Sequence, residues 1–196
     1  MEEKKAIDII EERDIQHLDS HWYIAVVQNR DEQNCAERLQ RQGYESYVAV
    51  QKRTTVWKDG RRKERTTVVI PAKVFVRATE QQRSQEIVKL PYIKRFFTNI
   101  SGRTNEFNRH PVAIIPDAQF QSFRLMLERS ETPVTIEERP SFKLGDQVTI
   151  IQGSLKGLSG TVVKSPNGKM RLYIQVESLG YASVEVEAAN IEKVSN

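Results

Sequence analysis

The sequence predicts an α+β protein, in which an N-terminal α/β sandwich with an antiparallel sheet and about three helices is linked to a small C-terminal β-barrel. Three observations lead to this prediction. A β-rich run at 21–27 is followed by a helix signal. From 141 onward, short β-branched runs alternate with turn residues, and no helical period competes. The polar, proline-punctuated segment 128–140 lies between these two regions and is typical of a linker.

Composition sets limits on function. The 30 basic and 26 acidic side chains leave a formal net charge of +4, which by itself does not indicate a polyanionic partner. The single cysteine, Cys35, excludes an internal disulfide and is typical of a reducing compartment. The histidines and Cys35 show no metal-ligand spacing, and no nucleophile–base pair or phosphate-binding glycine loop is found. We therefore expect no metal, no cofactor and no catalysis.

The N-terminus is charged and lacks the apolar segment of a signal peptide. No apolar run approaches the roughly 20 residues that span a bilayer. We expect a cytoplasmic protein without membrane association, associated with the nucleoid only through its partner, and a monomer. Residues 1–20 form a charged extension to which we assign no function.

The first ordered domain is predicted at 21–127. After the strand at 21–27, Asn29 or Asp31 can cap a helix that carries Cys35 on its apolar face and stops at Gly43. Further strands are expected at 47–50 and 68–77, the second interrupted at Pro71, with a charged loop between them.

The same domain should contain two more helices. Thr79 and Gln82 have the spacing of a capping box, and Pro91 discourages continuation of the helix that they begin. A strand is expected at 92–98. Asp117 can cap a third helix, in which apolar residues recur at helical spacing as Phe120, Phe123 and Leu127.

The second domain is predicted at 141–196. Val148 and Ile150 alternate with polar residues, and a tight turn is expected at 166–168 before the alternating strand 170–176. About five short strands in roughly 55 residues are typical of a closed barrel, which leaves few exposed edges. Gly160 opens a β-branched run where a bulge or a close backbone approach is expected.

The segment from Phe142 to Val163 resembles the KOW motif, although other SH3-like barrels have similar turn residues. The N-terminal half resembles the N-terminal domain of NusG-type transcription elongation factors, through Trp22-Tyr23, the run Val69-Ile-Pro-Ala-Lys-Val-Phe-Val76, Pro91-Tyr-Ile93, and Pro111-Val-Ala-Ile-Ile-Pro-Asp117. Two motif sets in the correct order are more specific than either alone. Ala72 and Lys73 replace the commoner Gly-Tyr, and the KOW turn lacks the usual Gly-Pro-Phe. These departures suggest a specialised paralogue, similar to RfaH or to the antiterminators of polysaccharide operons.

The resemblance implies contacts with RNA polymerase. An apolar depression would dock on the clamp helices of the largest subunit, and the second helix would touch the gate loop of the other large subunit. The alternative for the apolar residues is plain core, and for the polar residues a helix N-terminus. The matching positions are Ile70, Lys73, Phe75, Phe96 and Ile114 for the clamp helices, and Arg83, Ser84 and Gln85 for the gate loop.

Two basic regions are candidate nucleic-acid contacts. The run 52–65 can follow a phosphate backbone of upstream DNA through Lys58, Arg61, Arg62 and Lys63, and Trp57 can stack on a base. Arg38 and Arg41 lie on the helix that the resemblance implies faces the non-template strand. A solvated hairpin tip and a solvated helix face are the alternatives.

The resemblance implies a transcription elongation or antitermination factor without enzymatic turnover. It would bind RNA polymerase through its first domain and offer the KOW barrel to a second partner, either a small-subunit ribosomal protein or the Rho factor. The competing hypothesis is a ribosome- or RNA-binding KOW protein.

Overall fold

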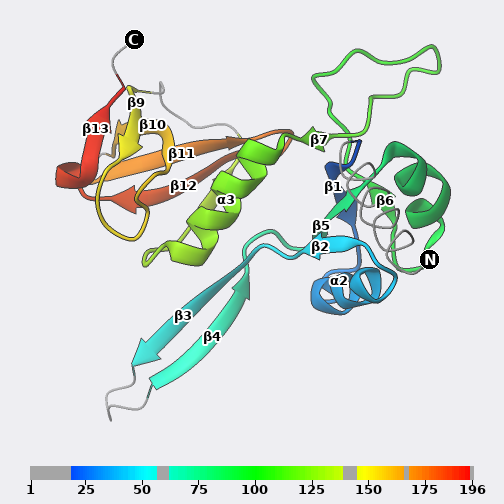
Figure 1. The fold of residues 1–196 in the computed structure, drawn as a ribbon, viewed down its shortest axis with the longest axis horizontal. Coiled ribbons are helices and arrows are strands. Elements are labelled where there is room, and N and C mark those ends of the chain that lie inside the picture. Colours follow the sequence, from blue (N-terminus) through cyan, green and yellow to red (C-terminus); the bar gives the residue numbers. More distant parts are fainter. Residues whose placement is uncertain (1–18, 57–61, 139–144, 166–167, 195–196) are drawn as a thin grey trace, which may run out of the picture. The chain divides into compact units, whose positions relative to one another are not determined.

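The computed structural model describes residues 19–56, 62–138, 145–165 and 168–194, with the backbone alone at 53–56 and 62. The predictions for the N-terminal extension, for Trp57, Lys58 and Arg61, and for the first two residues of the 166–168 turn lie outside the described residues. Internal contacts divide the chain into two compact units, which Figure 1 colours along the sequence. Unit 1 comprises Met1–Tyr47 and Ala72–Ile114; unit 2 comprises Val48–Pro71 and Ile115–Asn196.

Unit 1 is built on an antiparallel sheet. Its strands lie in the order β2 (Glu45–Tyr47), β5 (Lys73–Ala78), β1 (His21–Val26) and β6 (Arg95–Phe96), and β7 (Ile114–Ile115) also pairs with β1. The central strand β1 is formed by the predicted aromatic and β-branched run, of which Trp22 to Ala25 are buried. The strand expected at 92–98 is shorter than predicted, because only Arg95–Phe96 joins the sheet ladder beside an isolated bridge between Thr98 and Val112.

Helix α2 (Glu32–Arg41) packs on β2 and β5 through an apolar face. Cys35 and Leu39 are fully buried, and Ser46 of β2 donates its hydroxyl to the carbonyl of Ala36 at 2.9 Å. The helix ends where Gly43 adopts a φ of +88°, as its sequence signal predicts. The side chain of Asp31 caps no backbone N–H; it accepts from Asn34 and Cys35 instead.

The second helical segment is irregular. A π-helical turn η1 (Gln82–Glu86) runs into a short 3₁₀ turn η2 (Ile87–Lys89), and the chain becomes extended at Leu90 before Pro91. The capping box is present: the Thr79 N–H donates to Gln82 Oε1 at 2.9 Å, and the Gln82 N–H donates to Thr79 Oγ1 at 3.2 Å.

Unit 2 contains a long hairpin, a helix and the barrel. Strands β3 (Val50–Val56) and β4 (Arg62–Val68) form a two-stranded antiparallel ladder, where the sequence suggests a charged loop. Figure 1 draws this hairpin as a narrow ribbon. Helix α3 (Asp117–Arg129) buries Phe120, Phe123 and Leu127, and packs on a barrel strand. Asp117 is the first residue of α3, and Pro116 occupies the N-cap position before it.

The barrel is a six-stranded sheet in the order β13-β9-β10-β11-β12-β8. Its strands are β9 (Gln147–Ile150), β10 (Ser159–Lys164), β11 (Met170–Val176), β12 (Gly180–Val186) and β13 (Ile191–Lys193), with the 3₁₀ turn η3 (Ala188–Asn190) before the last. Gly160 is a close approach, as predicted: a Cβ there would lie 2.4 Å from the carbonyl oxygen of Tyr173.

The sixth strand, β8 (Thr135–Glu137), lies within the segment 128–140 and pairs with β12. The strand was not predicted because the prolines and glutamates around it are typical of a linker, although Val134, Thr135 and Ile136 are β-branched. The predicted α+β class is confirmed, with an antiparallel α/β domain and a separate sheet-rich C-terminal region.

Candidate functional site

The register of the unit 1 sheet separates the two aromatic residues expected to dock on the polymerase. Phe75 of β5 lies opposite Ile24, and Phe96 of β6 lies opposite Ala25. Residues that face each other across a ladder share a face, whereas neighbours along a strand point to opposite faces. Phe75 and Phe96 therefore lie on opposite faces of the sheet and do not form one depression.

Both rings are also buried. Phe75 is 0% exposed and packs at a tilt against Tyr47, with 6.2 Å between ring centroids. Phe96 is 5% exposed and makes an edge contact with Tyr23 at 6.0 Å. Ile70, in unit 2, is buried as well. These three side chains occupy the core, which was the alternative reading of the sequence.

Two of the five residues expected to contact the clamp helices reach solvent. Ile114 is 43% exposed, an unusual fraction for a large apolar side chain in a strand. Lys73 is half-buried, and its Nζ lies 5.7 Å from the centroid of the Phe97 ring, within the range of a cation–π contact. Lys73 lies opposite Val26, and so on the same face as Phe75.

Arg83 joins η1 to the other face of the sheet. Its guanidinium carbon lies 5.3 Å from the ring centroid of Phe96 and 5.6 Å from that of Tyr23. Its Nε donates to Glu80 Oε2 at 2.8 Å, its Nη2 donates to Glu80 Oε1, and the Tyr23 hydroxyl donates to the same carboxylate at 3.2 Å. Burial of Tyr23, followed by the nearby charge of Glu80, raises the pKa of the phenol to about 12. The hydrogen bond from Arg83 lowers the pKa of Glu80.

The cluster of Arg83, Glu80, Tyr23 and Phe96 fixes the orientation of η1. The next two residues, Ser84 and Gln85, are exposed on this turn. Ser84 donates its hydroxyl back to the carbonyl of Glu80 at 2.7 Å. The exposed side chains of Ser84 and Gln85 therefore lie on a turn whose position is fixed by the contacts of Arg83.

The entry to β5 is held by a buried carboxylate. Glu32, at the start of α2, is 3% exposed, and its Oε1 accepts from the backbone N–H of Ala72 at 2.6 Å. The Ala72 carbonyl in turn accepts from Val27 N–H at 3.0 Å. Ala72 has a φ of +58°, a region that favours glycine. This positive φ gives a physical reason for the glycine that the NusG-type motif quoted above commonly has at this position.

The predicted DNA-facing helix presents Arg38 and Arg41 to solvent. The Arg38 guanidinium stacks 4.6 Å from the centroid of the Tyr92 ring, which holds the cation flat on the surface. The Tyr92 hydroxyl donates to Gln42 Oε1 at 3.3 Å. Arg41 is 78% exposed and forms a 3.5 Å ion pair with Glu37, an exposed pair that contributes little to stability.

Cys35 lies beneath this surface and is chemically protected. Its Sγ donates to Asp31 Oδ2 at 3.3 Å. Burial, and then the hydrogen bond to Asp31, raises the pKa of the thiol to about 12. The thiol is therefore protonated and a poor nucleophile at neutral pH.

The basic hairpin is positioned at its base by Gln51, which is 3% exposed. The Gln51 amide donates to the carbonyl of Thr132 at 2.8 Å, and its oxygen accepts from the N–H of Val134 at 3.1 Å. These bonds join β3 to the connection between α3 and β8. Farther along, Lys63 is exposed and Arg62 lies in β4, whereas Lys58 and Arg61 lie outside the described residues.

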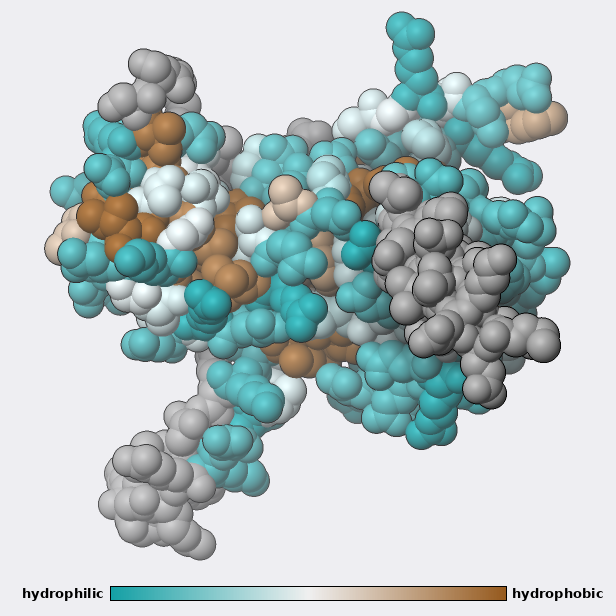
Figure 2. Space-filling model, in the orientation of Figure 1, coloured by the Kyte–Doolittle hydropathy of each residue, from teal (hydrophilic) through white to brown (hydrophobic). Residues whose placement is uncertain are grey.

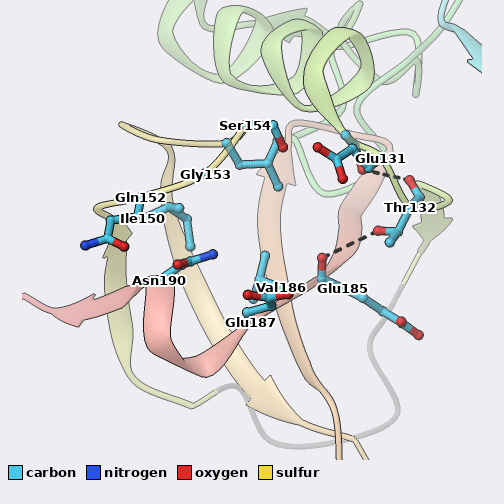
Figure 3. A pocket seen from close by; sticks show the side chains of 12 residues that line it. Glu131, Thr132, Ile150, Gln152, Gly153, Ser154, Glu185, Val186, Glu187 and Asn190 are labelled. Carbon is cyan, nitrogen blue, oxygen red and sulfur yellow. Dashed lines mark hydrogen bonds between the residues drawn. The ribbon is translucent and has the colours of Figure 1, made fainter.

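A cavity of about 290 Å³ lies at one end of the barrel (Figure 3). The labelled residues come from the α3–β8 connection, from β9 and the loop that follows it, and from the segment that runs from β12 into η3. Thr132 donates its hydroxyl to the carbonyl of Glu185 at 3.4 Å across this hollow. The Glu185 carboxylate is already paired with Lys169 at 2.7 Å, so its charge is largely neutralised.

Other classes of site find no support in the described part of the chain. No cluster of three or more His, Cys, Asp and Glu side chains is arranged there to hold a metal ion. None of its helices combines the length and the apolarity needed to cross a bilayer.

The sequence analysis assigns no role to three residues that position the candidate sites of their own units: Glu32, Gln51 and Tyr92. Glu32 and Gln51 look like ordinary surface residues, and nothing in the local pattern signals that the fold buries them. Tyr92 belongs to the Pro91-Tyr-Ile93 motif, but its stacking with Arg38 depends on a tertiary contact between positions 54 residues apart in sequence, 38 and 92.

Comparisons with known proteins identify the family. No curated protein sequence matches the chain. A structure on domain interaction in Thermotoga maritima NusG is 18% identical, covering 91% of this chain and 99% of that chain with a TM-score of 0.44. A crystal structure of the MjSpt4:Spt5 complex is 15% identical, covering 89% and 97% with a TM-score of 0.27. The model of the family described as transcription termination factor nusG matches residues 20–124. Because this match spans more than half of the 196 residues, the chain belongs to the NusG family of transcription elongation factors.

Proposed function

We propose that this chain is an elongation and antitermination factor that binds RNA polymerase through residues 21–127 and recruits a second partner through the KOW barrel at 141–196. Residues 128–140 connect the two modules, and 1–20 precede them. The single observation that carries the proposal is the family match over 20–124, which covers nearly all of the first module. The chain acts as an adaptor, without turnover, in the cytoplasm.

The polymerase contact rests on side chains that reach solvent. Ile114, with its 43% exposure, supplies the apolar contact for the clamp helices, and the half-buried Lys73 contributes a charge. Ile70, Phe75 and Phe96 are buried and contribute to the fold, not to a direct contact. The anchored turn η1 offers Arg83, Ser84 and Gln85 to the gate loop of the second large subunit.

The test is a direct binding measurement between the tagged full-length chain and purified RNA polymerase. Ile114→Asp should weaken binding at least tenfold, because an interface centre tolerates a buried charge poorly. Val194→Asp is the matched control, since Val194 is an apolar residue of the barrel with 50% exposure. Equal affinities for the parent and I114D, with circular dichroism showing both folded, would reject the clamp-helix contact.

The gate-loop contact is tested by a separate readout. Ser84→Ala with Gln85→Ala leaves the Arg83 cluster intact, so it should reduce readthrough of a pause site while circular dichroism and thermal melting remain those of the parent. Unchanged readthrough would remove these two residues from the interface.

We propose that the basic hairpin and α2 contact DNA near the polymerase. Arg38, stacked on Tyr92, is oriented to reach the non-template strand, and Arg41 beside it adds charge. Lys58, Arg61, Arg62 and Lys63 follow the phosphates of the upstream duplex. Replacing these four by Ala should flatten the slope of log K against log[salt] by about 0.7–0.9 for each lost phosphate contact.

The hairpin experiment compares elongation scaffolds with and without upstream DNA across a salt series. A variant with the same change in charge, made in the barrel, is the control: Lys156, Lys164, Lys169 and Lys193, all to Ala. Parallel slopes for the parent and the hairpin variant would leave the hairpin as a solvated surface.

The barrel partner is a small-subunit ribosomal protein or Rho, and the departures at Ala72 and Lys73 favour a specialised, operon-restricted paralogue. Affinity purification of the tagged chain distinguishes this proposal from a ribosome- or RNA-binding role. Polymerase subunits in the purified material support the proposal, whereas ribosomal RNA that survives high salt, without polymerase, rejects it. Occupancy across the genome then separates a specialist from a general factor.

A further inference from the structure

Unit 1 carries a long loop between β6 and β7 that takes no part in the function proposed above. Residues 99–111 form it, and its two ends are joined: the Asn99 N–H donates to the Pro111 carbonyl at 2.8 Å, next to the bridge between Thr98 and Val112. In Figure 1 the segment, coloured green before β7, extends away from the sheet of its own unit. It is therefore a closed loop that projects into solvent.

The base of this loop is packed. Gly102 lies against Pro111, where a Cβ would come 2.7 Å from the proline Cγ, and the Gly102 N–H donates to the Asn99 carbonyl at 3.1 Å. A ring nitrogen of His110 lies 3.2 Å from the Gly102 carbonyl oxygen. These contacts restrict the angle at which the loop leaves the sheet.

The tip is held by Asn105. Its side-chain oxygen accepts from the backbone N–H groups of Phe107 and Arg109, each at 3.0 Å, and its own N–H donates to the Arg109 carbonyl at 2.9 Å. Asn108 completes the turn with a φ of +57°, a conformation that Asn tolerates better than most residues. Phe107 is thus carried on a turn with a defined backbone.

The ordered tip displays an aromatic ring and two cations. Phe107 is 72% exposed, so its ring lies outside any core. Arg103 and Arg109 are exposed on either side of it in sequence, against one carboxylate, Glu106. Within the described residues neither arginine forms a salt bridge. In Figure 2 the projecting loop is mainly hydrophilic, with a hydrophobic spot near its end.

We propose that this tip binds single-stranded nucleic acid, with a base stacked on Phe107 and the flanking phosphates paired with Arg103 and Arg109. An aromatic platform beside cations is the general chemistry of sequence-tolerant single-strand binding. Each part is suited to its role. The ring is exposed, the guanidinium groups form no ion pair with a carboxylate of the described residues, and the turn at Asn105 orders the backbone before the ligand arrives.

The polar surroundings favour nucleic acid over a protein partner. A protein interface core is depleted in charge and is built from adjoining apolar side chains. Here the neighbours of Phe107 along the loop are Asn105, Glu106, Asn108 and Arg109, whose amides and charges suit base edges and phosphates. The second exposed apolar residue of the loop, Ile100, lies near its base.

The test uses the purified full-length chain with fluorescent 15-nucleotide oligouridylate or oligothymidylate, and no polymerase. Phe107→Ala should weaken binding about tenfold, and Phe107→Trp should retain it, because stacking is the contact removed and restored. Phe107→Leu keeps an apolar side chain without the π-face and should behave like Phe107→Ala. Ile100→Ala is the matched control in the same loop and should bind as the parent does.

The cations give an independent readout. Arg103→Ala with Arg109→Ala should flatten the salt slope by about 0.7 for each phosphate contact to a single strand. An oligonucleotide carrying 5-iodouracil should crosslink to Phe107, as located by mass spectrometry; tighter binding of the RNA or of the DNA identifies the source of the strand. Unchanged affinity of F107A, full affinity of F107L, or no oligonucleotide binding by the parent would overturn the proposal. None of these outcomes depends on whether the chain binds polymerase.

Discussion

Removing the Glu32 carboxylate should destabilise unit 1 strongly for a single substitution. Its hydrogen bond to the Ala72 N–H is 2.6 Å long, buried and charged, and a bond of this kind contributes about 1.5–3 kcal/mol. Besides the carboxylate, Glu32→Ala removes one methylene group, Cγ, which is buried with the rest of the 3%-exposed side chain and contributes roughly 0.8 kcal/mol. It leaves the Ala72 N–H without this acceptor. We expect a loss of about 2–4 kcal/mol in the free energy of unfolding.

Glu32→Gln is the matched variant, because it keeps the chain length and an acceptor oxygen but removes the charge. It should lose only about 1 kcal/mol, since a neutral hydrogen bond is roughly half as strong as a charged one. Urea denaturation followed by circular dichroism measures both variants. Equal losses for E32A and E32Q would show that charge at this position, and not the hydrogen bond, supports the turn.

A second substitution tests the same turn from the other side. Ala72 at a φ of +58° costs about 1 kcal/mol relative to an unstrained residue. Ala72→Gly relieves this strain but increases the freedom of the unfolded chain, which costs about 0.4–1 kcal/mol. The net change should stay within about 0.5 kcal/mol of zero. In the E32A background, a relaxed turn should make the gain from A72G smaller, which a double-mutant cycle detects. A loss of less than about 0.5 kcal/mol for E32A, which is no more than a typical surface substitution causes, would refute the reasoning.

Three further predictions follow from the buried groups and the barrel edge. With its pKa raised to about 12, the Cys35 thiol should react slowly with iodoacetamide at pH 8 and quickly after unfolding. The stability that the protonated thiol contributes is full below the unfolded pKa and is lost as pH rises toward 12. The C35A variant should not show this pH-dependent loss of stability. Gly160→Ala should unfold or severely destabilise the barrel, because the new Cβ meets the Tyr173 carbonyl at 2.4 Å, whereas the exposed Lys164→Ala on the same strand should melt as the parent does. A fragment of residues 132–196 should give dispersed β-type NMR spectra and melt higher than 141–196, since only the longer one contains β8; equal melting would show that this strand adds nothing.

The sequence supports much of the fold because local signals and tertiary structure agree at those places. The capping box at Thr79 forms as predicted, and Gly160 sits where a strand crosses close to its neighbour. Apolar and polar residues alternate along the strands of the barrel, so these strands can be recognised even where their exact ends cannot be predicted. The family could be inferred from the order of the two motif sets along the chain, which does not depend on the exact geometry of either unit.

The candidate functional residues were harder to predict, because the burial of a side chain and the face of the sheet on which it lies depend on tertiary structure. An apolar residue in a motif looks the same whether it docks or packs, and only the register separates Phe75 from Phe96 on opposite faces. The basic run 52–65 indicates a hairpin, but the length of its strands could not be predicted, because they are rich in charged residues and threonine and show no apolar face. The 99–111 loop has neither period nor known motif, so its Asn105-centred turn emerges only from the hydrogen bonds.

The placement of the hairpin in the chain makes it an exchangeable part. Strands β2 and β5 are direct neighbours in the unit 1 sheet, with Tyr47 opposite Phe75, so everything from 48 to 72 is formally one enlarged connection between two paired strands. Such a connection can be lengthened, shortened or recharged while the ladder beneath it keeps its order. A hairpin of different length or charge can therefore be grafted onto these two strands without redesigning the sheet of unit 1.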